Sequence, residues 1–282
     1  MKQKIFQRLA MTLSIGLVCA AMTTEAQANH SWGGYHWSRT TSQFTLKLGN
    51  NLTTSNWNSR LTQASSNWNS GNSRLLTAIV GGSTNSSCGM VRGTTQVCNA
   101  AYGNTGWLGL ASINLSGSHI TQGTAKMNDT YFNSSQYNNV NERQHVMCQE
   151  IAHTFGLGHT SEDGSSQNTC MDYFSNTGSN AGSTLSTKPN AHDFAQLNSI
   201  YSHLDSSFTA MAFGETLPEE SRAKVDIDAD PVSWGSLVHQ STNGRSSQYE
   251  RHNLDSSVTV THVYWTLEAA QNCKSCDHRG GR

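Results

Sequence analysis

The segment from residue 149 to residue 159 combines, at fixed spacing, the side chains that a catalytic metal site needs. Positions four apart on a helix project from one face, so Gln149 and His153 can reach the same ion. Glu150 lies between them, angled to hold a water. Gly156 allows the chain to turn sharply, so that His159 can return as a third ligand. Because zinc catalysis requires three protein ligands, an open position and a general base, this spacing predicts a zinc centre.

This segment resembles the signature of the metzincin metallopeptidases, H-E-x-x-H-x-x-G-x-x-H followed by a Met-turn. The Met-turn is matched by Cys170-Met171-Asp172-Tyr173. The resemblance implies that Met171 supports the zinc site from below and that Tyr173 contacts the metal or stabilises the oxyanion. It also implies a secreted zinc endopeptidase that acts on protein or peptide substrates, with Zn²⁺ as cofactor and a structural Ca²⁺ left open.

The first position of the motif departs from the family, because it holds Gln149 where the family has histidine. An amide oxygen is a neutral and weaker zinc ligand than imidazole. His145 cannot replace it, because it lies about 12 Å from His153 along a helix axis. The motif from Gln149 to His159, preceded by Val146-Met147-Cys148, is similar to the motif of secreted matrixin-like sequences that have the same glutamine. Gln149 is therefore retained as the expected third metal ligand, beside His153 and His159, with a water in its place as the alternative.

The resemblance gives Glu150 the role of general base, which takes a proton from water and passes it to the leaving amine. Two other functions stay open. One is a zincin-fold binding protein whose catalytic site has weakened or decayed at Gln149. The other is a structural or adhesive exoprotein, which leaves the spacing of the motif unexplained.

The surrounding pattern predicts an α+β layout, and the resemblance implies that this is the zincin/metzincin fold, a twisted mixed sheet with an active-site helix and a Met-turn. A stripe of Trp57, Leu61, Ala64 and Trp68 predicts one helix. Further helices are expected over 140–155 and from Pro189 to near Asp205, and strands over 44–48, 75–80, 107–115 and 120–127. By resemblance, the strand at 120–127 takes the place of the family's edge strand, which pairs with extended substrate.

The composition shifts near residue 206, which suggests a domain over 29–205 and a β-rich C-terminal extension of unknown role over 206–282. The resemblance implies that the first of these is a metzincin-like catalytic domain. A connector is expected at 218–220 and 226–230, followed by β-rich pieces at 234–239 and 258–265. The extension is too short to be trusted as an independent core. A short lead before the first strand leaves little room for an inhibitory prodomain, so the extension is the candidate to cover the cleft.

The first 28 residues have the pattern of a secretory signal peptide. Lys2, Lys4 and Arg8 precede an apolar run over 9–22, and Ala26-Gln27-Ala28 forms a cleavage site. A membrane anchor is not expected, because the run is shorter than the roughly 20 residues that a bilayer requires. Leu17-Val18 before Cys19 does not fit a lipoprotein signal. We expect an extracellular protein, with the periplasm as the alternative.

Removal of the signal peptide takes Cys19 with it and leaves an even set of cysteines, which in an exported chain indicates disulfides. Sequence alone allows many connectivities. Proximity along the chain favours Cys88–Cys98, Cys148–Cys170 and Cys273–Cys276, and a redox or metal role for the last pair is the less favoured alternative. By the resemblance, a Cys148–Cys170 bridge would tie the zinc helix to the Met-turn.

The composition excludes other classes of function. A formal net charge of -1 argues against nucleic-acid binding, which normally needs a basic excess. A serine hydrolase lacks support, because no Gly-x-Ser-x-Gly elbow is present. No stable membrane anchor is expected, and the oligomeric state stays open. The histidines outside the motif show no ligand spacing and are expected to be mostly surface or core residues: His30, His36, His119, His192, His203, His239, His252, His262 and His278.

Overall fold

The structure, a computed structural model, describes residues 30–83, 88–211, 230–272 and 276–280. The expected signal peptide, most of the expected connector and Cys273 lie outside the described residues. No helix among the described residues is long and apolar enough to cross a membrane.

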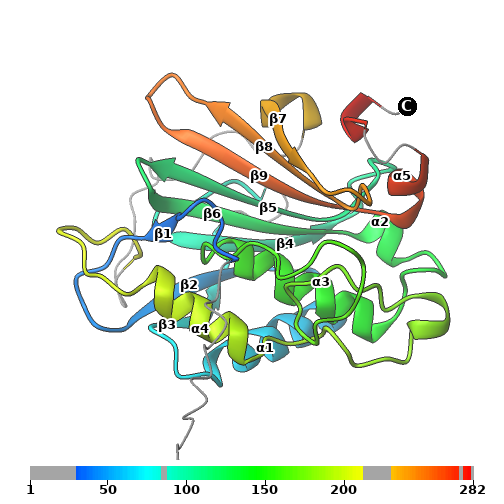
Figure 1. The fold of residues 1–282 in the computed structure, drawn as a ribbon, viewed down its shortest axis with the longest axis horizontal. Helices are drawn as coiled ribbons and strands as arrows, with labels where there is room; N and C mark the ends of the chain where they lie inside the picture. The colour runs from blue at the N-terminus through cyan, green and yellow to red at the C-terminus, as the bar shows by residue number, and fades with distance from the viewer. Residues whose placement is uncertain (1–29, 84–87, 212–229, 273–275, 281–282) are drawn as a thin grey trace, which may run out of the picture.

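A nine-stranded mixed sheet runs through the described part of the chain, with strand order β3-β2-β4-β6-β5-β9-β8-β7 (Figure 1). Strands β2, β3, β4 and β6 are parallel, and β5 is antiparallel to β6. The short β1 pairs with β6 outside this path. The bounds of the first six strands are β1 His36–Trp37, β2 Phe44–Asn51, β3 Leu75–Gly81, β4 Thr94–Ala100, β5 Trp107–Ser116 and β6 His119–Asn128.

The expected β-rich extension supplies three antiparallel strands that continue this same sheet: β7 Ser236–Gln240, β8 Ser246–His252 and β9 Val258–Trp265. Strand β9 pairs with β5 along its whole length, from Trp107↔Trp265 to Leu115↔Val258. The edge of β5 is therefore covered by residues that lie far away in the sequence.

One sequence prediction about the sheet is wrong. Strand β6, expected to be the edge strand, lies between β4 and β5 and forms ladders with both. Its neighbours use its hydrogen-bonding groups on both sides, so it cannot accept a further strand along this stretch.

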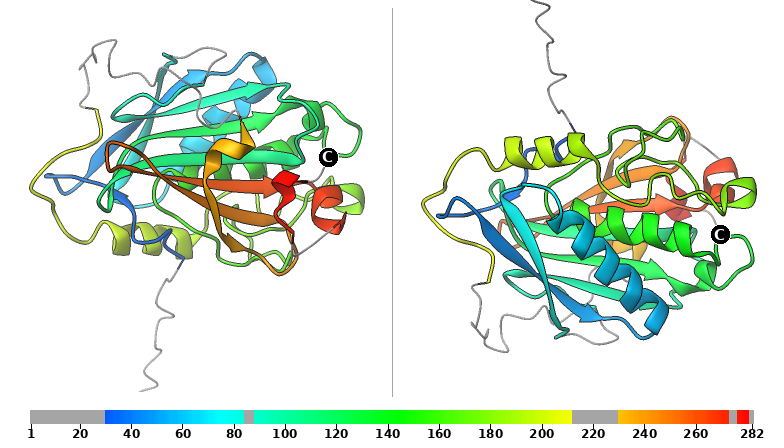
Figure 2. Two further views of the ribbon diagram at one scale, coloured as in Figure 1. Left: turned by 90° about the horizontal axis from the view of Figure 1, so that it is seen from above. Right: turned by 90° about the horizontal axis from the view of Figure 1, so that it is seen from below.

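The main helices lie on one side of the sheet (Figures 1 and 2). Helix α1 buries the predicted stripe of Trp57, Leu61, Ala64 and Trp68 in the core. The helices are α1 Ser55–Asn69, α2 Asp129–Phe132, α3 Val140–His153, α4 Ala191–Ile200 and α5 Leu267–Asn272, with 3₁₀ turns at Gly178–Asn180, Pro231–Trp234 and His278–Gly280. The expected mixture of helices with a twisted mixed sheet is confirmed.

Asparagines cap the N-termini of α3 and α4, and α4 begins at Ala191 rather than at the expected Pro189. Asn139 accepts hydrogen bonds from Asn141 and Glu142 at the start of α3. Asn190 forms a capping box with Asp193 at the start of α4.

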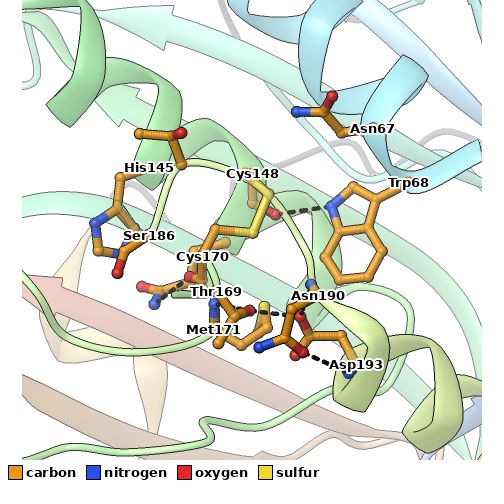
Figure 3. The surroundings of a disulfide bond; sticks show 12 residues. Asn67, Trp68, His145, Cys148, Thr169, Cys170, Met171, Ser186, Asn190 and Asp193 are labelled. Atoms are coloured by element: carbon orange, nitrogen blue, oxygen red, sulfur yellow. Dashed lines mark hydrogen bonds between the residues drawn. A yellow bond between two sulfur atoms is a disulfide. The ribbon is translucent and has the colours of Figure 1, made fainter. Parts of the chain in front are cut away.

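Two of the three expected disulfides are confirmed, Cys88–Cys98 and Cys148–Cys170. The second connects α3 to the loop that follows the zinc motif (Figure 3). For the third pair, only Cys276 is among the described residues.

Candidate metal centre

The backbone after α3 returns the chain to the end of the helix. His153 is the last residue of α3, and Gly156 adopts a φ of 97°, a left-handed conformation that favours glycine. A Cβ at residue 156 would also overlap the carbonyl oxygen of Tyr35. This turn brings His159 back against His153, with the two ring centroids 4.7 Å apart.

His153 and His159 point their Nε2 atoms at each other, 3.0 Å apart. The Nδ1 of His153 donates to the Leu157 carbonyl oxygen at 2.8 Å, and the Nδ1 of His159 donates to Glu162 Oε1 at 2.9 Å. Because those oxygens can only accept, the Nε2 atoms of the neutral rings carry lone pairs. Two lone pairs that face each other need a cation between them, and such outer hydrogen bonds are typical of zinc-ligating histidines.

Burial keeps these rings neutral. It lowers the pKa of His153 well below the usual value, and the neighbouring His159 lowers it further. Burial also lowers the pKa of His159. For Glu162, burial by itself raises the pKa, but its hydrogen bonds and electrostatic interactions with His159 and His239 outweigh this effect and bring the pKa to about 2. The site therefore offers neutral imidazoles backed by an ionised carboxylate, which suits a metal at neutral pH.

A third histidine reaches this pair from the C-terminal strands. One ring nitrogen of His262, in β9, lies within 4.8 Å of those of His153 and His159. Its Nε2 faces the hydroxyl groups of Tyr173 at 3.0 Å and Ser246 at 3.1 Å. Its Nδ1 is buried without a hydrogen-bond partner. This nitrogen is thus free to bind a metal.

Sequence reasoning missed His262, which was expected to be a surface or core histidine. His262 is more than 100 residues from the motif in the sequence, and it comes close to α3 only because β9 pairs with β5. One local signal existed. His262 lies on the same face of β9 as Val260 and Tyr264, both fully buried, and a histidine on such a face needs a polar partner.

Gln149 is placed differently from a histidine at the same position. Its Nε2 donates to the carbonyl oxygens of Cys170 at 2.9 Å and Asp172 at 2.8 Å. It therefore ties α3 to the expected Met-turn. Its Oε1 is buried and lacks a hydrogen-bond partner, so this oxygen is free to act as a further ligand.

Glu150 is fully buried, and neither of its carboxylate oxygens has a hydrogen-bond partner. Its Oε2 lies 4.0 Å from the Nδ1 of His262. A Cβ on Gly109 of β5 would overlap the carboxylate, so the glycine provides the space for it. Burial raises the pKa of Glu150 well above its usual value. An isolated buried carboxylate is costly, which again indicates a missing cationic or polar partner.

The expected Met-turn, residues 170–173, packs against the site. Met171 is fully buried, and its carbonyl oxygen accepts a hydrogen bond from the backbone of Thr160 at 2.8 Å. The Tyr173 ring lies 4.6 Å from the ring of His159. Burial raises the pKa of Tyr173 well above its usual value, so its hydroxyl stays protonated.

A cavity of about 190 Å³ opens onto the three histidine rings. Trp32 and Gln248 line it and are joined by a hydrogen bond of 2.8 Å from the indole Nε1 to the amide oxygen. A larger cavity, about 970 Å³, lies beside α5 and contains none of the metal-site residues.

No family model and no curated protein sequence matches this chain. Among solved structures, the chain is similar to high choriolytic enzyme 1, a hatching enzyme zinc-protease from Oryzias latipes (medaka fish). That match has 10% identity and a TM-score of 0.35 and covers 59% of this chain and 94% of the other. One structure of myroilysin matches with 14% identity, a TM-score of 0.34, and coverage of 60% and 84%. Another myroilysin structure matches with 12% identity, a TM-score of 0.33, and coverage of 62% and 89%. Because these values are low, we base the proposed function on the geometry of the site.

Proposed function

We propose that this chain is an exported zinc-dependent peptidase whose metal is held by His153, His159 and His262. One observation carries the proposal. Two neutral imidazoles face each other across 3.0 Å, and a third histidine joins them from a distant strand. The Nδ1 of this third histidine, His262, lies 4.0 Å from the buried, unpartnered carboxylate of Glu150.

The donor set fits zinc. Three imidazole nitrogens with an open position are typical of catalytic zinc, and the orphaned oxygen of Gln149 offers a fourth donor. When bound, zinc supplies Lewis-acid polarisation of a carbonyl group and a lowered pKa for water. Nothing among the described residues supports the structural Ca²⁺ that the sequence left open.

Glu150 is the proton carrier of the proposed reaction. Its burial raises its pKa, which brings the carboxyl group closer to the range in which it can both take and return a proton. It accepts a proton from the attacking water and donates it to the leaving amine. The absence of a side chain at Gly109 leaves its carboxylate free of steric contact on the β5 side.

Tyr173 has a positioning role in this proposal. Its hydroxyl lies 3.0 Å from the Nε2 of His262, so the Nε2–H can donate to it and leave the Nδ1 lone pair for the metal. Ser246 offers a second oxygen to the same nitrogen at 3.1 Å. The oxyanion role that the resemblance implies for Tyr173 remains part of the proposal.

The substrate is proposed to be a peptide that enters through the 190 Å³ cavity. An extended peptide cannot add to β5, because β9 already fills that edge. Contacts with the substrate are therefore limited to the residues around the scissile bond. The two disulfides agree with the proposed location outside the cytoplasm.

A second candidate is a zinc-binding protein without catalytic activity. The covered β5 edge and the small cavity favour it, as does Gln149 Oε1, which would close the coordination sphere if it bound zinc. Both candidates share the same metal centre. They differ in whether a position is left open for water.

The substitution Glu150→Gln distinguishes these functions, because it keeps the size of the side chain and removes its basicity. The parent protein should hydrolyse casein in a chelator-sensitive manner, and the variant should lose at least 100-fold in rate, the order that general-base catalysis contributes, while it retains zinc. A parent that binds zinc but cleaves neither casein nor gelatin would support the second candidate. Undiminished hydrolysis by Glu150→Gln would overturn the role of Glu150.

A further inference from the structure

We propose that a second zinc ion binds to His36, His203 and Asp205, a group of side chains separate from the site described above. One ligand atom of each residue lies within 4.8 Å of the other two. His36 belongs to β1, whereas His203 and Asp205 follow α4. The fold thus brings together residues from both ends of the predicted catalytic domain.

The three ligand atoms form a nearly equilateral triangle. The two Nε2 atoms of the histidines are 3.2 Å apart, and the Oδ1 of Asp205 lies 3.5 Å from His36 and 3.4 Å from His203. Tetrahedral ligands that bind zinc at about 2.0–2.1 Å are separated by about 3.3–3.4 Å. The triangle therefore has the dimensions of one face of a zinc tetrahedron.

Outer hydrogen bonds fix the direction of two of these ligands. The Nδ1 of His36 donates to the Gly34 carbonyl oxygen at 3.0 Å, so Nε2 is the ring atom available to a metal. The backbone N–H of Arg39 donates to the Oδ2 of Asp205 at 2.9 Å, which leaves Oδ1 directed at the histidines. Partners of this kind are typical of metal ligands.

His119 lies beside this group and contacts its carboxylate. Its Nε2 lies 3.4 Å from the same Oδ1 of Asp205, and its ring is 5.0 Å from the ring of His36. The pairing of β1 with β6 sets His119 directly beside His36, because the two are register partners. The two imidazoles and one carboxylate of the group are donors suited to zinc, and water can complete its coordination.

An ordinary ion-pair cluster explains this arrangement less well. The nitrogen–oxygen distances of 3.4 to 3.5 Å exceed those of good N–H···O hydrogen bonds, about 2.7–3.2 Å. Three nitrogens also converge on a single oxygen while the other oxygen of Asp205 is engaged by Arg39. A central cation would bind the ligand atoms of His36, His203 and Asp205 and tie β1 to the chain after α4.

Metal content measured by mass spectrometry on the purified full chain, loaded with zinc and desalted, tests this proposal. His203→Ala and Asp205→Asn should each hold one zinc equivalent fewer than the parent. The side chain of His203 is 52% exposed, so its removal should leave the fold intact. In Asp205→Asn, the oxygen of the new amide can still accept the hydrogen bond from Arg39. Exposed His252, which belongs to neither cluster, provides the matched control His252→Ala.

The double variant His153→Ala/His159→Ala separates the two sites. It should lose one equivalent as well, and adding Asp205→Asn to it should remove a second equivalent. Cobalt substituted into the double variant should give the intense visible absorption of a tetrahedral site, which Asp205→Asn abolishes. The proposal is overturned if His203→Ala and Asp205→Asn keep the metal content of the parent, or if cobalt in the double variant gives no such absorption.

Discussion

Single residues at the proposed centre perform tasks that their types alone do not reveal. The roles of Glu150 and the two motif histidines are proposals, whereas Gln149 is seen to use its amide nitrogen to bind backbone carbonyl groups. A histidine at position 149 could not donate to both carbonyl groups from one nitrogen. The glutamine is therefore a connector between α3 and the expected Met-turn, whether or not its oxygen binds the metal.

We predict that Gln149→Ala lowers the free energy of unfolding by about 2 kcal/mol, because it leaves the buried carbonyl oxygens of Cys170 and Asp172 without these donors. Urea unfolding followed by fluorescence measures the loss. Gln63, on the exposed face of α1, gives the control Gln63→Ala. Equal stability of the two variants would show that the hydrogen bonds of Gln149 contribute little.

The sequence predicts the part of the candidate site whose residues lie close together along the chain. Glu150, His153 and His159 lie within one helix and the turn after it, so helical geometry relates them. His262 could not be found in this way, because its approach depends on the pairing of β9 with β5. The cluster of His36, His203 and Asp205 was not predicted for the same reason, because its residues come from β1 and from the chain after α4.

At the scale of elements, α3 is fixed to the loop that follows the zinc motif by a covalent bond as well as by Gln149. The Cys148–Cys170 disulfide closes a loop with a sequence separation of 22. The indole Nε1 of Trp68, in α1, donates to the carbonyl oxygen of Cys148 at 3.2 Å (Figure 3). This hydrogen bond connects α1 to α3 at the position of the disulfide.

We expect the Cys148→Ala/Cys170→Ala variant to lose about 3 kcal/mol of stability, the amount that loop-closure entropy gives for a loop of this length. Chemical unfolding of parent and variant under non-reducing conditions measures the difference. Because the disulfide sulfurs are not metal ligands in this proposal, zinc content should not change below the unfolding transition. Loss of zinc from the folded variant would contradict this separation of roles.

The turn at Gly156 is a second element whose geometry the site requires. Gly156→Ala places a Cβ against the Tyr35 carbonyl oxygen at a positive φ, so His159 must shift. We predict that zinc affinity falls at least tenfold in a competition assay with a chromogenic chelator. Gly103→Ala is the matched control, because Gly103 also has a positive φ, 85°, but no atom within 4 Å of the added Cβ. Similar zinc affinities for the two variants would contradict this account.

The predicted elements agree with the structure where the periodicity is strong. The stripe of α1 and the strand from Phe44 were identified from the spacing of apolar residues alone. Strands β4 and β8 were not predicted, because polar residues such as Gln96 and Gln248 interrupt their patterns. Sheet order was also beyond reach of sequence patterns, since a ladder is set by contacts between distant segments.

At the scale of the whole molecule, the C-terminal strands β7, β8 and β9 belong to the same sheet as β5 and β6, the strands that α3 packs against. The division into 29–205 and 206–282 remains a prediction about domains, but β9 forms a continuous ladder with β5. The extension thus covers the β5 edge and contributes a proposed ligand. It has the position that a cover of the cleft would need.

We predict that a chain ended after residue 211 loses zinc from the proposed centre and self-associates, because truncation removes His262 and exposes the β5 edge. Metal analysis and size-exclusion chromatography with light scattering measure both effects. A monomeric truncated chain with full zinc content would show that the extension is an independent appendage.

The zinc content of His262→Ala tests the central claim most directly, compared with His252→Ala on the neighbouring strand. The account predicts that His262→Ala remains folded by circular dichroism, loses one zinc equivalent at concentrations that saturate the parent, and no longer hydrolyses casein. His252→Ala should match the parent in each measurement. Full zinc content with undiminished affinity in folded His262→Ala would contradict the account.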